Sequence, residues 1–176
     1  MAEKCLQGRG VLVDLHAHFG LQKIAVGFDD WMRILEQDKV VVEKGDMLLL
    51  HTGWTGLIMQ MNKHPDMEML DSSCAGLDGR DEKLLQWITD SGIAALIADN
   101  YAVEHWPPKP KQGRRAMIPL HEHCLFKLGI PLGEIWWLKD LATWLRAHKR
   151  NRFLLTAPPL RLPGAVGSPT TPVATV

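Results

Sequence analysis

His121 and Glu134 are two side chains with metal-binding chemistry in a segment, residues 119–138, that is otherwise mostly apolar. Burying an ionisable group costs roughly several kcal/mol unless the group is paired or bound to a metal. Imidazole and carboxylate are ligands of divalent ions such as zinc or manganese, which usually take three or four protein ligands. The pair is therefore a candidate for part of a metal site. The alternative is that His121 caps or packs and Glu134 faces water.

The elements predicted around this pair would bring the two side chains together. Apolar residues recur at three- and four-residue spacing and predict a helix over 116–128, which Gly129 ends; they are Met117, Leu120, Cys124, Leu125 and Leu128. Residues 130–137 are branched and aromatic without a helical period, and we interpret them as a short strand after a turn. His121 near the helix start and Glu134 on the returning strand can then meet in one side-chain contact.

Helices and apolar strands alternate along the rest of the chain. Such alternation is typical of an α/β sheet covered by helices. Strands are predicted at 11–15, 47–51, 93–98 and 152–157, and helices at 29–38, 81–90 and 138–150.

Polar residues follow two of the buried strands, where open sheets tend to build sites. Thr52 and Trp54 lie in a loop of small hydroxyl residues and glycines after strand 47–51, and we expect that loop to face a ligand. An ordinary turn with one packed indole is the alternative. Asp99 and Asn100 follow strand 93–98.

A second histidine pair, His16 and His18, is predicted at the end of strand 11–15. Alternate residues on a strand point to one side, and some metal hydrolases use this geometry. Polar residues at an ordinary strand end are the other interpretation.

Composition excludes several classes of protein. Twenty basic residues balance twenty acidic ones, which removes the electrostatic footprint of nucleic-acid binding. Three distant cysteines suggest no disulfide framework and fit a reducing cytosol. No apolar run approaches the roughly 20 residues of a membrane span, and the N-terminus lacks a signal-peptide pattern. We expect one cytoplasmic domain, residues 1–176, with a Gly/Pro-rich segment at 158–176 that composition alone would class as disordered.

Five segments in order along the chain resemble the cyclase family, the metal-dependent hydrolases that include kynurenine formamidase and isatin hydrolase, and especially its larger branch. The segments are Cys5-x-Gly-Arg-Gly-Val-Leu-Val-Asp14, Gly45-Asp-x-Leu-Leu-Leu-His-Thr-Gly-Trp54, Ala98-Asp-Asn-x-Ala-Val-Glu104, Leu120-His121 with Leu128-Gly-Ile-Pro-Leu-Gly-Glu134, and Phe153-Leu-Leu-Thr-Ala-Pro-Pro-Leu with Leu162-Pro-Gly-x-Val-Gly-Ser-Pro169.

This resemblance implies a swivelling β/β/α fold and hydrolysis of an amide or lactam C–N bond at a zinc or manganese site. It implies an arylformamidase like kynurenine formamidase, which acts on a small-molecule amide in tryptophan catabolism, and a homo-oligomer. The family's downstream ligands fall on His121 and Glu134. The pocket would be lined or braced by Thr52, Trp54, Asp99 and Asn100, and residues 158–176 would form an ordered loop near the site.

The chain departs from the family in one respect. Members carry an upstream His-x-x-x-His-x-Asp motif, which supplies most metal ligands, and a further histidine that acts as general base. This chain begins after that motif, so we expect an N-terminally truncated cyclase-like fold, the C-terminal two-thirds of the usual domain. Whether it is an enzyme is left open. One hypothesis is the family hydrolase; the alternative is a catalytically inactive protein that acts through protein–protein contact. A third hypothesis is a rebuilt site of His16, His18, His121 and Glu134.

Overall fold

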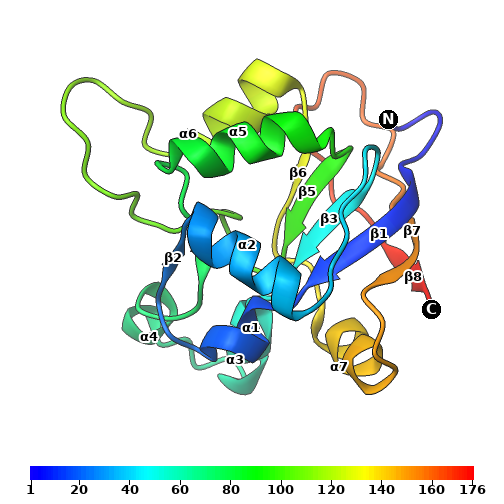
Figure 1. The fold of residues 1–176 in the computed structure, drawn as a ribbon. Coiled ribbons are helices and arrows are strands. Elements are labelled where there is room, and N and C mark those ends of the chain that lie inside the picture. The colour runs from blue at the N-terminus through cyan, green and yellow to red at the C-terminus, as the bar shows by residue number, and fades with distance from the viewer.

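The computed structural model describes residues 1–176, which form helices and strands in alternation (Figure 1). The strands are β1 (Gln7–Val13), β2 (Ala25–Val26), β3 (Met47–Leu50), β4 (Gly76–Leu77), β5 (Ala95–Ala98), β6 (Leu132–Gly133), β7 (Arg152–Thr156) and β8 (Val173–Thr175). The helices are α1 (Leu15–Phe19), α2 (Phe28–Gln37), α3 (Trp54–Gln60), α4 (Met67–Asp71), α5 (Glu82–Ser91), α6 (Pro119–His121), the π-helical η1 (Glu122–Leu128) and α7 (Lys139–Ala147).

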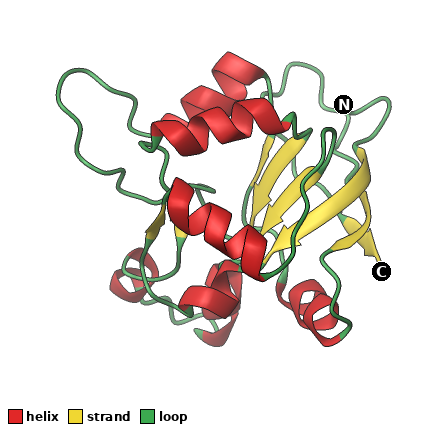
Figure 2. Ribbon diagram, viewed as in Figure 1, coloured by secondary structure: helices red, strands yellow, loops and turns green.

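A mixed six-stranded sheet in the order β6-β5-β3-β1-β7-β8 forms the centre of the fold (Figure 2). Strands β1, β3, β5 and β6 run parallel to one another, while β7 is antiparallel to both β1 and β8. Helices lie between the parallel strands in the sequence, because a parallel pair needs a crossover. Strands β2 and β4 form a separate two-stranded parallel sheet.

Successive residues of the central strands enter two different cores, because side chains alternate across a sheet. In β3, Leu48 and Leu50 pack into a core with α2 and α5, while Met47 and Leu49 pack into a core with α7. All four residues of β3 are therefore buried, as in a strand covered on both faces.

The predicted strand at 11–15 is wrong at its C-terminal end, which changes the interpretation of the histidines. β1 ends at Val13, Asp14 caps the next helix by accepting a hydrogen bond from the Ala17 amide, and Leu15 begins α1. His16 and His18 therefore lie on a helix and not on one side of a strand. A strong local cap outweighed the continuing apolar pattern.

The helix predicted at 116–128 begins at Pro119 and continues through η1 to Gly129, which closes it with φ +68°. The turns around Cys124 are buried as expected, but Met117 precedes the helix and Leu125 is exposed. The wider π turn shifts residues off the face that a regular α-helix would present.

The predicted strand at 130–137 is only two residues long, β6, because Ile135 leaves the extended conformation at φ +58°. Residues 158–176 are ordered, contrary to their composition. Strand β8 pairs with β7, and Pro159 bridges Thr170. None of the helices combines the length and the apolarity that crossing a membrane requires.

Candidate functional site

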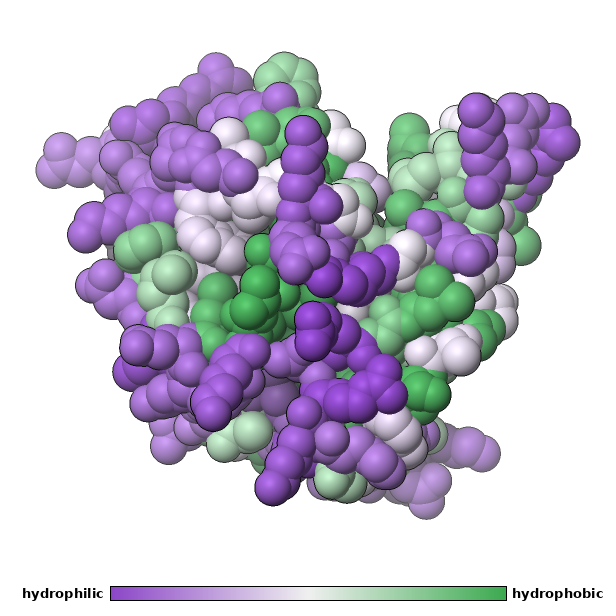
Figure 3. All heavy atoms as spheres, turned by 45° about the vertical axis from the view of Figure 1, so that its right-hand side comes forward, coloured by the Kyte–Doolittle hydropathy of each residue, from purple (hydrophilic) through white to green (hydrophobic).

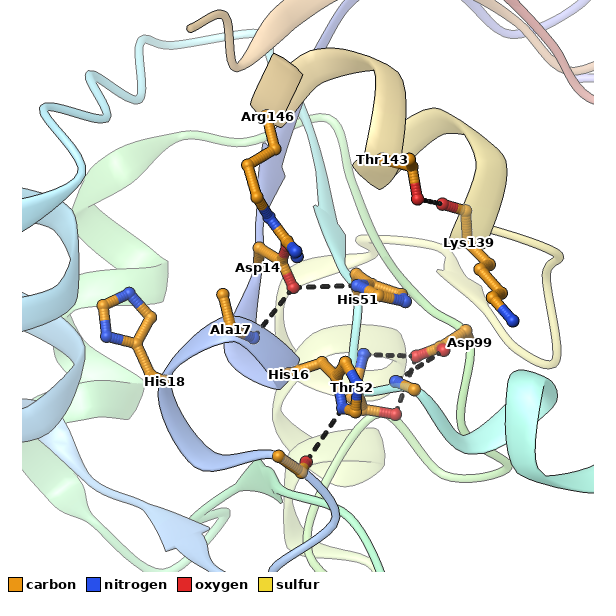
Figure 4. Close-up of polar contacts among 12 residues, drawn as sticks. Asp14, His16, Ala17, His18, His51, Thr52, Asp99, Lys139, Thr143 and Arg146 are labelled. Carbon is orange, nitrogen blue, oxygen red and sulfur yellow. Dashed lines mark hydrogen bonds and ion pairs between the residues drawn. The ribbon is translucent and has the colours of Figure 1, made fainter.

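The carboxyl ends of β1, β3 and β5 bring several polar residues to one edge of the sheet (Figure 4). Asp14 follows β1 and lies 2.8 Å from Nδ1 of His51, which follows β3. Arg146 of α7 donates to the other carboxylate oxygen of Asp14. Burial raises the pKa of Asp14, but the hydrogen bonds from His51 and Arg146 outweigh burial and lower it to about 2.

Asp99 follows β5 and is completely buried. Its Oδ1 accepts hydrogen bonds from the Thr52 amide (2.6 Å) and hydroxyl (2.7 Å), and its Oδ2 accepts one from the Gly53 amide (2.9 Å). Gly53 has φ +89° and precedes α3, so the Asp99 carboxylate meets the amides at a helix start, where negative charge is favoured. The contacts made by Thr52 and Asp99 tie β3, β5 and α3 together.

Trp54 is buried, as in the alternative of an ordinary turn with one packed indole. Its indole Nε1–H donates to the Leu70 carbonyl at 3.3 Å, and its ring lies 5.1 Å from that of Tyr101. Trp54 and Asn100 both line a cavity of about 20 Å³, which has room for one water molecule.

Asn100 connects the two turns that carry carboxylates. Its Oδ1 accepts a hydrogen bond from the Val103 amide at 2.8 Å, and its backbone carbonyl accepts one from the Ile135 amide at 3.0 Å. Val103 directly precedes Glu104, and Ile135 directly follows Glu134. Asn100 therefore holds the backbone beside both carboxylates.

The Glu104 side chain packs against the start of α6, and only 2% of the residue is exposed. It accepts hydrogen bonds from the amides of Leu120 and His121, and its Oε1 lies 2.9 Å from Nδ1 of His121. Gly79 packs against this carboxylate, since a Cβ there would lie 2.5 Å from Oε2. The helix start and the imidazole both stabilise a buried negative charge.

The predicted contact between His121 and Glu134 is confirmed: Nε2 of His121 lies 3.0 Å from Oε1 of Glu134. The imidazole is thus clamped between two carboxylates. Glu104 first and then Glu134 raise the pKa of His121 to about 9, against the opposing effect of burial. His121 is consequently an imidazolium at neutral pH.

Backbone strain flanks both carboxylates of this clamp. Val103 and Ile135 have φ values of +59° and +58°, which are rare for β-branched residues. Such conformations persist only where surrounding contacts hold them, and they concentrate at functional sites.

A cavity of about 530 Å³ has Glu134 in its wall, together with mostly apolar residues. These include Ile97 of β5, Leu132 of β6, Trp136 of the loop after β6, and Leu160 of the C-terminal segment. The clamp therefore borders a space lined by hydrophobic groups and by the ordered tail.

The chain's own residues fall short of a complete metal site. Oε1 of Glu134 is a buried oxygen without a hydrogen bond, despite its ion-pair distance to His121. Glu104 orients His121 as outer carboxylates orient metal-binding histidines. Yet no group of three or more histidine, cysteine, aspartate and glutamate side chains could hold a metal ion. Two donors are present where three or four are needed.

Comparison with known families decides the classification. The family model described as "Putative cyclase" matches residues 1–105, more than half of the 176-residue chain. The chain belongs to the cyclase family. None of the curated proteins compared with the chain matches it.

Solved structures agree with the family and with the predicted cyclase-like α/β fold. A crystal structure described as a novel cyclase shares 31% identity with a TM-score of 0.81, over 97% of this chain and 53% of that one. Isatin hydrolase A from Ralstonia solanacearum shares 16% identity with a TM-score of 0.67, over 99% of this chain and 62% of that one. Isatin hydrolase A from Labrenzia aggregata, bound to benzyl benzoate, shares 16% identity with a TM-score of 0.69, over 99% and 63% of the two chains. The chain spans between half and two-thirds of the length of these structures.

His16 and His18 do not join the clamp of this cyclase-family chain. Nδ1 of His16 lies 3.0 Å from the Gly20 carbonyl oxygen, and Nε2 of His18 lies 2.8 Å from Asp38. Because no group of three metal-binding side chains exists, the hypothesis of a site rebuilt from both histidines, His121 and Glu134 is wrong.

Glu104 is the residue of the clamp that sequence reasoning missed as a candidate. A carboxylate a few residues past a buried strand is a signal of the kind that singled out Asp99 and Asn100. What the pattern could not supply was its partner, since sixteen residues separate Glu104 from Leu120.

Proposed function

We propose that this chain forms part of a metal-dependent hydrolase that cleaves an amide C–N bond, with arylformamidase activity like that of kynurenine formamidase in tryptophan catabolism. One observation carries the proposal. Glu104, His121 and Glu134 converge in a clamp on the wall of an apolar cavity of about 530 Å³. The structural similarity to isatin hydrolases, which supports the fold, is consistent with this chemistry.

The residues of the clamp have distinct roles in this proposal. Glu104 accepts the hydrogen bond from Nδ1 and so directs Nε2 toward Glu134. His121 and Glu134 then offer one nitrogen and one oxygen donor to zinc or manganese. When bound, such an ion polarises a carbonyl and lowers the pKa of water. The apolar lining of the cavity suits the aryl part of a small amide and excludes bulk water.

The proposal requires further metal donors, because two do not complete a site. They would come from another polypeptide segment placed beside Glu134, in the same subunit or in a second copy of a homo-oligomer. Thr52, Trp54, Asp99 and Asn100 would brace the pocket through the hydrogen bonds and packing described above rather than touch substrate.

The lack of a third ligand favours a second candidate function. A cyclase-family chain without a complete metal site would be catalytically inactive and would act only through protein–protein contact. Exposed apolar side chains near the cavity, such as Ile135 and Leu160, would then meet a partner.

Metal content and turnover distinguish the two functions. The purified protein is equilibrated with zinc or manganese, analysed for bound metal, and assayed for hydrolysis of N-formylkynurenine. The hydrolase proposal predicts bound metal and turnover that are both lost in Glu134→Gln. Both should persist in the control Glu122→Gln, whose carboxylate is exposed and pairs with Lys127.

Metal affinity should also increase with pH, because the ion must displace the proton that His121 holds with a pKa of about 9. We expect metal affinity to rise about tenfold for each pH unit between pH 7 and 9.

Metal retained in Glu134→Gln would refute the ligand assignment. A wild-type protein with neither metal nor turnover would reject the hydrolase for this chain and favour the contact function.

A further inference from the structure

A concavity of about 990 Å³ lies on a different part of the molecule from the His121 clamp. It is bounded by β1, β7, the end of α2 and the end of α7, and it shares no lining residue with the cavity beside Glu134. Figure 3, which brings this side of the molecule forward, shows hydrophobic atoms recessed between projecting hydrophilic side chains. The concavity is therefore amphipathic, with an apolar floor that includes Leu12, Val40 and Phe153.

The rim of this concavity is strongly basic, although the whole chain has no net charge. Six cationic residues line it, against the acids Asp14 and Asp38; the cations are Arg9, Lys39, Arg146, Lys149, Arg150 and Arg152. Arg9 pairs with Asp46 and Glu43, Arg146 with Asp14, and Asp38 faces His18.

Four exposed cations remain without an acidic partner: Lys39, Lys149, Arg150 and Arg152. Arg150 instead lies over the Trp144 ring and donates to the Arg152 carbonyl. Like charges on one concave rim repel one another, which destabilises the folded chain. Solubility requires charge on the surface but does not require four cations at one place.

Two of these cations occupy strained positions. Lys39 and Lys149 both have φ +53° and follow the ends of α2 and α7. The same pair of closing hydrogen bonds surrounds each: Val40 to Leu35 with Lys39 to Glu36, and Arg150 to Leu145 with Lys149 to Arg146. Glycine is the residue usually found at this position, because it bears no Cβ. Lysine occupies this position at both helix ends, although glycine would be more stable there, and both lysines border the same concavity.

Helix polarity alone does not account for this arrangement. A cation complements the partial negative charge at a helix C-terminus, which is about half a unit for each helix. Two helix ends therefore balance about one positive charge, whereas four full charges are unpaired. The surplus leaves a positive potential over an apolar floor.

We propose that this concavity binds a small organic anion that carries a phosphate or carboxylate group on an apolar body. Lys39, Lys149, Arg150 and Arg152 attract and hold the anionic group, while Leu12, Val40 and Phe153 contact the body. The site is independent of the hydrolase proposed above.

Calorimetric titration of the full chain with 1-naphthyl phosphate, 1-naphthoate and neutral 1-naphthol tests this site. We expect at least one of the two anions to bind and to weaken as salt is added, because the rim is exposed to solvent. Naphthol should bind at least tenfold more weakly. The phosphate and the carboxylate together identify which anionic group the rim prefers.

The double variant Lys39→Gly/Lys149→Gly removes two charges and relieves both strained positions, so it should fold and melt at a higher temperature than wild type. Binding should nevertheless weaken about tenfold. The matched control is Lys63→Gly/Lys127→Gln, which removes the same charge. Lys63 also has positive φ (+71°), and neither control residue lines the concavity.

Four outcomes would overturn the proposal. Equal binding of naphthol would show apolar contact alone. Equal weakening in the control variant would show a general charge effect. Unchanged binding in the glycine variant, or no binding of either anion to wild type, would show that the rim holds no such ligand.

Discussion

At the scale of single residues, the most distinctive feature is one imidazole held between two carboxylates. Glu104 is secured by backbone amides and buried, whereas Glu134 keeps an oxygen free of hydrogen bonds at the cavity wall. The two carboxylates are therefore not equivalent. The first fixes the orientation of His121, and the second is the one open to exchange its partner.

The metal-free protein should lose stability in mild alkali because of this clamp. The pKa of His121 in the folded state, about 9, is above its ordinary value of 6.5. The native state then binds the proton more tightly, so this stabilisation is complete below pH 6.5 and is lost as the pH rises through 9. Urea unfolding in a chelator should show the loss in wild type and not in His121→Gln. An equal loss in both would contradict it.

Gly79→Ala should disturb the clamp without removing any of its groups. The new methyl group would lie 2.5 Å from Glu104 Oε2, 2.8 Å from Pro119 and 3.0 Å from the Leu120 nitrogen. Overpacking of this kind costs about 1–3 kcal/mol. We expect a lower free energy of unfolding, measured by urea unfolding, and a lower pKa of His121, measured by NMR titration. Gly167→Ala, which meets no atom within 4 Å, is the control, and equal behaviour of the two variants would refute the expectation.

At the scale of elements, short irregular segments aim the chemical groups, and the regular helices and strands carry those segments. The π-helical η1 begins directly after His121, and β6 ends directly before Glu134. Each carboxylate is next to a β-branched residue with positive φ. The backbone at these points departs from its preferred conformations in order to place side chains.

Ile135→Asn should stabilise the protein. Ile135 has φ +58° and is 56% exposed, so the substitution relieves strain and sacrifices little packing. Asparagine adopts left-handed conformations at less cost, and we expect a gain of about 1 kcal/mol. For a chain of this size the melting temperature should rise by about 2–4 °C. Ile135→Val keeps the strain and should bring no gain; a similar rise in both variants would exclude strain as the cause.

At the scale of the whole molecule, the ends of the parallel strands and α7 are joined by ion pairs and hydrogen bonds of two aspartates. Asp14 after β1 contacts His51 after β3 and Arg146 on α7, while Asp99 after β5 holds the start of α3 (Figure 4). These contacts connect one end of the sheet to α3 and α7. Of the elements joined in this way, β5 lines the cavity beside Glu134 and α7 lines the basic concavity.

Asp14→Asn should lower the free energy of unfolding by an amount that depends on pH. The pKa of Asp14, about 2, is below its ordinary value of 3.8, so its stabilisation is present above pH 3.8 and is lost as the pH falls through 2. The shift corresponds to about 2 kcal/mol at neutral pH. Denaturant unfolding at pH 7, 5 and 3 should show a deficit that shrinks in acid. Asp29→Asn, at an exposed carboxylate, should show little deficit, and a constant deficit for Asp14→Asn would contradict the assignment.

Local patterns in the sequence were sufficient to predict α2, α5, α7, the helical segment that ends at Gly129, the apolar strands β3, β5 and β7, and the contact between His121 and Glu134. They did not predict α1, α3 or α4. The apolar period marks which face of α2 and α5 is buried, and Gly92 and Gly129 mark where helices end. Resemblance to the cyclase family, now confirmed, predicted the ordered tail that composition alone would not.

The tertiary structure decided features that depend on partners far along the chain. Glu104 became part of the clamp because the turn at Val103 brings it to the start of α6, and its sequence neighbours do not encode that meeting. The same reason explains why Trp54 is buried and why four cations from two helix ends and a strand meet around one concavity. Spacing along the chain determines local conformation, whereas the charge and burial of a group depend on what the fold places beside it.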